Sequence, residues 1–515
     1  MKTNRTIVGG LAVLLAAWGA SAQGRGGRRG GEPPDMQQQA QAQPGAENAQ
    51  ARRLPPPEEK SVVTHHSMHI GGQTLNYTAT AATYIIKDDA GNPKATFFFV
   101  AYTKDDVPDI TRRPISFLYN GGPGSASLFV HMGMGPRRVV LTPDGHGMPA
   151  PYSVADDEDT FLDASDLVFV DAVGTGYSRP VIGETPAQFY GVVEDANIFS
   201  DFIYQYITRN SRWASPKFLI GESYGTTRSA QLSGVLEHRH EIYLNGIVLI
   251  STVAFAAADP DARAAFPFPS YAATAWYHHL LPPDLQKESI EQVVQQARDF
   301  CRGEYYLALK KGDALPAAEK EKVVAQIARF TGLKPKFIEE TNLRISSFRW
   351  FKELLRDKRE TVGRLDSRFV GMDADAAGER PEYDPSEASY EGAFVGAFQN
   401  YVRNELKWDS EMYYAVSGNV RPWDNTGNQL VAETLRSAMT EESSLKVLVV
   451  CGYYDFATPL FGIEYTVDHM GLEPSIRKNI SFAYYESGHM VYIDRKAHDK
   501  LHTDVDNFIN AGFTH

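Results

Sequence analysis

The sequence has few cysteines and no excess of positive charge, and each absence excludes a class of protein. Only Cys301 and Cys451 occur among 515 residues, so a disulfide framework cannot replace a hydrophobic core. Cys451 follows an apolar run at residues 445–450 and is expected to be a buried free thiol. Acidic residues outnumber basic ones by 64 to 51, for a net charge of −13. This balance argues against nucleic acid or an anionic membrane as a partner.

The sequence also lacks a run long enough to span a membrane. The apolar run at residues 7–18, behind Lys2 and Arg5, is shorter than the roughly 20 residues that a membrane-spanning helix needs. The small residues Ala20 and Ala22 complete the pattern of a secretory signal peptide. A membrane anchor is the alternative interpretation. We expect a signal peptide at residues 1–22, an exported protein that is periplasmic or secreted, and no membrane span in the mature chain.

The composition changes along the chain in a way that predicts separate regions. Residues 23–58 are rich in Gly, Arg, Gln, Ala and Pro without apolar periodicity, which is typical of a disordered linker. Residues 67–119 then predict antiparallel strands, with a turn cluster at residues 88–93. Further along, strands and helices alternate, and this rhythm is typical of parallel strands with helices on both faces of the sheet.

The predicted strands and helices of this alternating part follow from short apolar runs and helical periodicity. The strands are expected at residues 166–171, 217–220, 244–250, 445–450 and 480–485, and the helices at residues 192–209, 226–237, 429–439, 460–470 and from residue 494 onward. Between them, residues 255–428 are mostly helical in pattern. We therefore predict an α/β core, residues 59–254 and 429–515, interrupted by a helical cap insertion at residues 255–428.

A candidate nucleophile lies in the motif Gly221-Glu222-Ser223-Tyr224-Gly225. A G-x-S-x-G pattern is weak by itself, but here a predicted strand runs into it and a predicted helix follows at once. This is the context of a nucleophile elbow, in which the serine occupies a strained turn and the glycines avoid clashes. A serine in an ordinary strand-to-helix turn is the alternative.

A serine hydroxyl needs a base, and the base needs an orienting carboxylate. When a nucleophile elbow is used, these follow the serine in the order carboxylate, then histidine, each after a later strand. Asp455 and His489 meet this demand. The alternatives fit less well because they are expected on helices; they are Glu464, Asp468, Asp494, His469, His498 and His502.

A third motif, Asn120-Gly121-Gly122-Pro123-Gly124, follows a predicted strand that ends at Tyr119. Glycines there leave backbone N–H groups free to approach a ligand, as an oxyanion hole requires. A tight turn without further role is the alternative.

Together these motifs resemble the serine carboxypeptidase family, in a bacterial-type exported form. The motifs that carry the resemblance are residues 120–124, 171–178, 221–225, the Asp455 loop and residues 488–490. The resemblance implies an α/β-hydrolase fold, with a mostly parallel central sheet flanked by helices and a large helical cap. It implies peptide substrates, release of C-terminal residues, commonly at acidic pH, and neither a cofactor nor a metal.

The resemblance also implies roles for particular residues. These are a catalytic triad of Ser223, Asp455 and His489, an oxyanion hole formed by the N–H groups of Gly122 and Tyr224, and a substrate-carboxylate site of Asn120, Gly121 and Glu222. The sequence departs from the family pattern at Leu118 (commonly tryptophan), at Ser125 (often cysteine), at Met134, where a glutamate commonly precedes Gly-Pro, and at Tyr492 (often proline).

Two other functions remain open at this point. An esterase or acyltransferase would use the same triad, and a catalytically silent binding protein would need none. Asn120 beside Glu222 favours the peptidase, because both side chains can hydrogen-bond a free carboxylate. We expect the insertion to govern specificity and not the chemistry.

Overall fold

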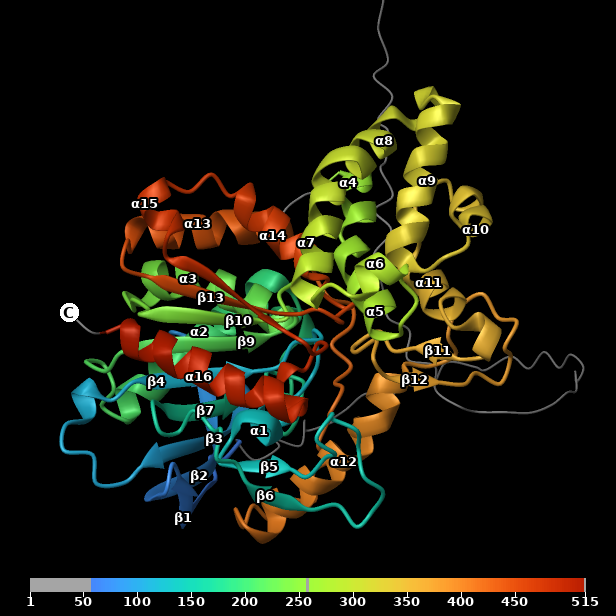
Figure 1. Ribbon diagram of the computed structural model, residues 1–515. Coiled ribbons are helices and arrows are strands. Elements are labelled where there is room, and N and C mark those ends of the chain that lie inside the picture. Colours follow the sequence, from blue (N-terminus) through green and yellow to red (C-terminus); the bar gives the residue numbers. More distant parts are fainter. Residues whose placement is uncertain (1–56, 256–258, 514–515) are drawn as a thin grey trace, which may run out of the picture. The chain divides into compact units, whose positions relative to one another are not determined.

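The computed structural model describes residues 57–255 and 259–513 (Figure 1). The predicted signal peptide, and the predicted linker up to residue 56, lie outside the described residues. Within the described ranges, no helix is both long enough and apolar enough to cross a membrane.

Ten strands form the central sheet of the described chain, nine of them in the order β1-β2-β3-β7-β4-β9-β10-β13-β14, with β8 paired to β3. Their bounds are β1 Ser61–Ile70, β2 Gln73–Lys87, β3 Pro93–Lys104, β4 Ile115–Tyr119, β7 Asp166–Val170, β8 Arg179–Pro180, β9 Lys217–Glu222, β10 Gly246–Ile250, β13 Lys446–Gly452 and β14 Ile480–Tyr485. Strands β1, β2, β3 and β7 pair antiparallel, whereas β7, β4, β9, β10, β13 and β14 are all parallel to one another. The predicted mostly parallel sheet is confirmed.

The orientation predicted for β4 was wrong. The sequence pattern placed it in an antiparallel group with the strands before it, but β4 pairs in parallel with β7 and β9. All five of its residues are buried, because β4 lies inside the sheet with helices on both faces. A short, mostly apolar strand does not reveal its direction, since direction depends on the connection that leads to it.

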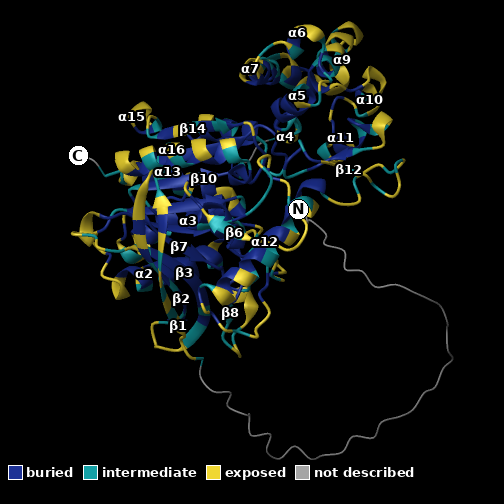
Figure 2. Cartoon of the chain, turned by 60° about the horizontal axis from the view of Figure 1, so that its bottom comes forward, coloured by how far each residue is buried: buried dark blue, intermediate teal, exposed yellow. Residues whose placement is uncertain are grey.

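Helices cover both faces of the sheet. Apolar strand residues alternate between the two layers: Leu249 packs with helices α2 (Val192–Arg209), α3 (Tyr224–His240) and α13 (Val431–Glu441), and Val248 packs with α1 (Leu128–Met134), α12 (Pro385–Asn404) and α16 (Arg495–Ala511). Figure 2 shows the central strands as buried, with exposed residues along the outer sides of the helices. This alternation matches the period of two that a strand imposes on its side chains.

The chain between β10 and α13 is mostly helical, and its helices α4–α11 extend away from the sheet (Figure 1). The bounds are α4 Pro260–Ala265, α5 Phe268–Tyr277, α6 Pro283–Gln286, α7 Ile290–Phe300, α8 Tyr306–Lys311, α9 Ala317–Thr331, α10 Pro335–Glu340 and α11 Ser347–Glu353, followed by the short strands β11 Thr361–Val362 and β12 Val370–Gly371. The last helix of this region, α12, packs on the core instead, where Phe394 contacts Phe129 of α1. The boundaries proposed for the insertion stay a prediction.

The remaining elements of the core are short. They are β5 Arg137–Val139 paired with β6 Val154–Asp156, and helices α14 Leu460–Asp468 and α15 Pro474–Arg477. Cys301 and Cys451 are both buried and free, and burial raises the pKa of each thiol well above its usual value.

Candidate active site

Ser223 lies at a sharp turn between β9 and α3, as the sequence predicted. Its φ of 59° and ψ of −126° are unusual for a residue with a side chain and store local strain. A Cβ atom on Gly221 would lie 2.3 Å from the carbonyl oxygen of Gly225, and one on Gly225 would lie 2.9 Å from that of Tyr119. The two glycines of the motif are therefore required for the turn to close against β4.

Asp455 and His489 are joined by a hydrogen bond. The distance between His489 Nδ1 and Asp455 Oδ2 is 2.8 Å, and both side chains are buried. Asp455 also accepts hydrogen bonds from the backbone N–H groups of Ala457 and Thr458 and from the Thr458 hydroxyl, at 2.7, 3.0 and 2.6 Å. These bonds fix the carboxylate, which in turn holds the imidazole ring in one orientation.

The same pair shifts the two pKa values in opposite directions. Burial raises the pKa of Asp455, but the charge of His489 and the hydrogen bonds to His489 and Thr458 outweigh burial, so the net pKa is lowered. Burial lowers the pKa of His489, but the charge and hydrogen bond of Asp455 outweigh it and the net pKa is raised. The aspartate is therefore an anion, and the histidine is a better proton acceptor than a free imidazole.

The end of β10 brings the serine and the histidine into one neighbourhood. The Ser223 N–H donates to the carbonyl of Ile250 at 3.0 Å, and the hydroxyl of the next residue, Ser251, donates to the carbonyl of His489 at 2.5 Å. Among residues 57–255 and 259–513, no hydrogen bond joins the Ser223 hydroxyl to the His489 ring. Such catalytic hydrogen bonds often tighten only when a substrate is bound.

The glycine-rich loop after β4 lies directly against the turn that holds Ser223. A Cβ atom on Gly121 would lie 2.3 Å from the backbone nitrogen of Tyr224, and Gly122 has a φ of 103°, which favours glycine. Tyr224 is the first residue of α3, so its N–H has no acceptor within the helix. The N–H groups predicted to form the oxyanion hole thus come from two backbone segments in contact.

Buried Arg228 fixes this loop from the helix side. Its guanidinium donates to the carbonyl of Asn120 at 3.0 Å and pairs with Asp195 at 2.7 Å. An arginine with a carboxylate partner and a backbone acceptor satisfies its donors in the absence of water. The sequence analysis missed Arg228, because an arginine inside a helical pattern gives no sign of which way it points.

Asn120 and Glu222, predicted to bind a carboxylate, are bonded to each other. Asn120 Nδ2 donates to Glu222 Oε1 at 3.0 Å, and Asn120 Oδ1 accepts from the backbone N–H of Val130 at the same distance. Burial raises the pKa of Glu222, although the charge of His489 and two hydrogen bonds oppose this effect. Glu222 therefore keeps its proton to a higher pH than an exposed glutamate does.

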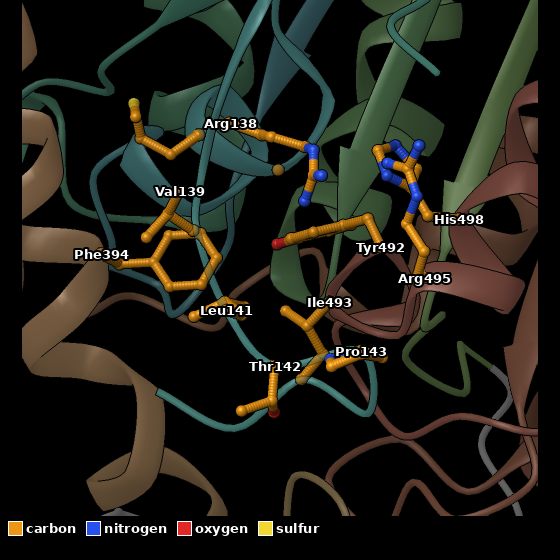
Figure 3. A pocket seen from close by; sticks show the side chains of 12 residues that line it. Arg138, Val139, Leu141, Thr142, Pro143, Phe394, Tyr492, Ile493, Arg495 and His498 are labelled. Carbon is orange, nitrogen blue, oxygen red and sulfur yellow. The ribbon is translucent and has the colours of Figure 1, made fainter. Parts of the chain in front are cut away.

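Tyr492 is a further member of this cluster that the sequence analysis did not identify. Its hydroxyl donates to Glu222 Oε2 at 2.5 Å. The ring packs on Gly133, where a Cβ atom would lie 2.1 Å from Tyr492 Cδ2, and it lines a cavity of about 200 Å³ together with Arg138 (Figure 3). Two departures from the family pattern, the stretch around Gly133 and the tyrosine at 492, thus pack against each other.

One buried group of side chains, which includes His498 of that cavity, has the donors of a metal site. Asp157, Asp159 and His498 place a ligand atom each within 4.8 Å of one another. The guanidinium groups of Arg138 and Arg495 lie 3.6 Å from Asp157 and 2.9 Å from Asp159, respectively. Two arginines already balance the two carboxylates, so the charge of this cluster does not call for a cation.

The comparison with known families identifies the family to which the chain belongs. The sequence matches the family described as serine carboxypeptidase over residues 74–502, a range that contains all of the predicted site residues. The chain belongs to the serine carboxypeptidase family. The resemblance to this family drawn from the sequence motifs is therefore confirmed, whereas the bacterial-type exported form stays a prediction.

A solved carboxypeptidase structure shares the fold. Kex1(delta)p, a prohormone-processing carboxypeptidase from Saccharomyces cerevisiae, is 16% identical, with 84% of this chain and 91% of that chain covered and a TM-score of 0.51. A thermophilic esterase from Thermogutta terrifontis is 12% identical, with coverages of 84% and 99% and a TM-score of 0.34. No curated protein matches the sequence. The predicted α/β-hydrolase fold is confirmed.

Proposed function

We propose that this member of the serine carboxypeptidase family releases C-terminal residues from peptides through an acyl-enzyme on Ser223. The observation that carries the proposal is the buried pair of Asn120 and Glu222 beside the serine. An esterase acting on uncharged esters has no use for a protonated carboxyl group at this position. A carboxypeptidase needs one, because its substrate ends in a carboxylate.

In the proposed reaction His489 takes the proton of the Ser223 hydroxyl while Ser223 Oγ attacks the scissile carbonyl carbon. The N–H groups of Gly122 and Tyr224 stabilise the negative oxygen that forms. His489 then gives its proton to the leaving amine, which departs as the terminal amino acid. Water, deprotonated by the same histidine, hydrolyses the acyl-enzyme, and Asp455 keeps the imidazole in the required tautomer.

The terminal carboxylate of the substrate would be held by Asn120, the Gly121 backbone and Glu222. A protonated Glu222 donates a hydrogen bond to that carboxylate, whereas an ionised one repels it. The raised pKa of buried Glu222 supports this role, and a bound carboxylate raises that pKa further. Peptide binding should therefore be favoured on the acidic side, where Glu222 is protonated, and cleavage should peak where that demand overlaps with a neutral His489.

We propose in addition that the protein is exported. The support is the short apolar run and the Ala20-Ser21-Ala22 site of the sequence. An intact mass that begins at Gln23 would agree with export and cleavage. Retention of Met1 in the native protein would contradict it.

Labelling with a fluorophosphonate tests the proposed nucleophile. We expect the wild type to be labelled on Ser223, Ser223→Ala to be unlabelled, and His489→Ala to lose nearly all turnover, by a factor of about 10⁴ to 10⁶. Asp455→Asn should also be severe, since it disturbs the histidine tautomer. Wild-type hydrolysis by Ser223→Ala would refute the mechanism.

A further inference from the structure

One segment between β11 and β12 reaches both loops that carry Asp455 and His489. We infer that residues 364–368, which we name the latch, position the histidine and the aspartate of the triad for catalysis. The inference rests on the proposed function and deepens it, because it assigns part of the reaction's geometry to the insertion, which the sequence associated with specificity alone. Its support is a set of hydrogen bonds on each of the two loops.

On the histidine side, the latch supplies the backbone of residues 486–489 with hydrogen-bond partners that a helix or strand would otherwise supply. The carbonyl of Leu365 accepts from the N–H of His489 at 2.7 Å, and Asp366 Oδ2 accepts from the N–H of Gly488 at 3.0 Å. Arg368 donates to the carbonyl of Glu486 at 2.9 Å. Three bonds along residues 486–489 therefore fix the direction in which the His489 side chain leaves the backbone.

On the aspartate side, the latch forms hydrogen bonds with the residues immediately before and after Asp455. The carbonyl of Arg364 accepts from the N–H of Phe456 at 3.0 Å. The backbone N–H and the hydroxyl of Ser367 both donate to the carbonyl of Tyr454, each at 3.1 Å. The residues immediately before and after Asp455 are thus held by the same five-residue segment that holds His489.

The latch lies too close to residue 488 for a side chain to fit there. A Cβ atom on Gly488 would lie 2.4 Å from the carbonyl oxygen of Leu365 and also 2.4 Å from Asp366 Cβ. Contact with the latch therefore requires a glycine before His489, whatever turn the chain makes at that position. Asp366 and Ser367 are themselves buried, at 1% and 0% exposure.

The latch is anchored to the insertion and not only to the loops that it holds. Asp384, at the N-terminus of α12, accepts from the N–H groups of Arg364 and Leu365, each at 3.1 Å. Arg368 pairs with Asp366 inside the latch at 2.7 Å and with Asp494, the N-cap residue of α16, at 2.9 Å. The carbonyl of Ser367 lies 2.8 Å from His278 Nε2. A rigid anchor is what a positioning element needs, because a displacement of 1 Å at the reacting groups can cost about 10²-fold in rate.

A pH profile separates positioning from general stability. The pKa of His489 is raised by Asp455, its hydrogen-bond partner, and by the charge of Glu222, and it is lowered by burial and by the charge of Arg364. If the latch is loosened, the bond to Asp455 weakens and the pKa of His489 falls, because Asp455 raises this pKa by more than the charge of Arg364, itself a latch residue, lowers it. The acidic limb of kcat/KM then moves to lower pH, which a simple loss of folded protein does not produce.

The test compares Asp366→Ala with Asp366→Asn, which loses the same charge but keeps an oxygen for the Gly488 N–H. We expect Asp366→Ala to lower kcat/KM about 10- to 10²-fold and to move the acidic limb, and we expect Asp366→Asn to restore most of both. Lys352→Met is the matched control, because Lys352 forms a buried pair with Asp373 in the same insertion, and its described hydrogen bonds, to Asp373 and Asp375, involve neither loop. It should leave the profile in place.

Each outcome bears on the inference. Equal losses of kcat/KM in Asp366→Ala and Asp366→Asn would overturn the inference, and so would a pH profile that is unmoved in all variants. In either case, labelling of the wild type on Ser223 would leave the proposed function intact. An unlabelled, inactive wild type would instead remove the proposed function. Should Asp366→Ala fail to fold, Ser367→Ala tests the aspartate side, with an expected loss of about 10-fold and the same direction of shift; an unchanged profile there would equally overturn the inference.

Discussion

The Tyr492 hydroxyl donates a hydrogen bond to Glu222 Oε2 at 2.5 Å, and this contact is one of those that lower the pKa of the glutamate. Burial of Glu222 raises its pKa, and the Tyr492 hydrogen bond lowers it again. The family pattern has a glutamate before Gly-Pro, where this chain has Met134. In this chain the Tyr492 hydroxyl is a hydrogen-bond partner of Glu222.

Tyr492→Phe is therefore expected to extend peptide cleavage to higher pH. Without the hydroxyl, ionised Glu222 loses a donor, its pKa rises further, and the protonated form that binds a substrate carboxylate persists. The alkaline fall of kcat/KM for a peptide with a free C-terminus should move upward. The profile for an uncharged ester serves as the control and should not move, and a downward shift for the peptide would contradict the role assigned to Tyr492.

Glu222→Gln is expected to flatten the alkaline fall that Tyr492→Phe only displaces. Glutamine is a permanent donor and has no proton to lose, so peptide binding should no longer weaken as pH rises. The measurement is kcat/KM against pH for the free-acid peptide in both proteins. If the variant shows the same alkaline fall as the wild type, a group other than Glu222 is responsible.

The ion pair between Arg298 of α7 and Glu464 of α14 is expected to stabilise the attachment of the insertion. The two groups lie 2.6 Å apart and both are nearly buried. Arg298→Met leaves Glu464 with the half-exposed Arg302 at 3.6 Å, and breaking a buried pair of this kind costs about 3–5 kcal/mol. A urea titration measures the loss in the free energy of unfolding.

An exposed ion pair provides the comparison for that experiment. Lys334 and Asp357 lie 3.0 Å apart with side chains 71% and 83% exposed, so Lys334→Met should cost less than about 1 kcal/mol. Equal losses in the two variants would show that burial of Arg298 and Glu464 adds nothing to their interaction.

The sequence predicted those parts of the protein that depend on local pattern. Ser223, Asp455 and His489 could be placed because each follows a strand whose apolar run is readable, and the structure has those strands at β9, β13 and β14. Helix α2 was predicted with the bounds that it has, since its apolar stripe is regular. In these segments local propensity and tertiary packing favour the same structure.

The parts that escaped prediction depend on contacts between distant segments. Tyr492 carries no periodic signal, and its partner Glu222 is 270 residues away in the chain. The latch is irregular backbone, and its hydrogen bonds to residues 454–456 and 486–489 are invisible in any local window. A buried tyrosine does require a partner for its hydroxyl, but composition does not reveal which partner it finds.

The central claim is that Ser223 removes residues from the free C-terminus of peptides. Its most direct test incubates one peptide, as the free acid and as the C-terminal amide, with the wild type and with Ser223→Ala at mildly acidic pH, and follows the products by mass spectrometry. We expect stepwise loss of C-terminal residues from the free acid, much slower cleavage of the amide, and no cleavage by Ser223→Ala. Equal cleavage of acid and amide by the wild type, or internal cleavage of either, would contradict it.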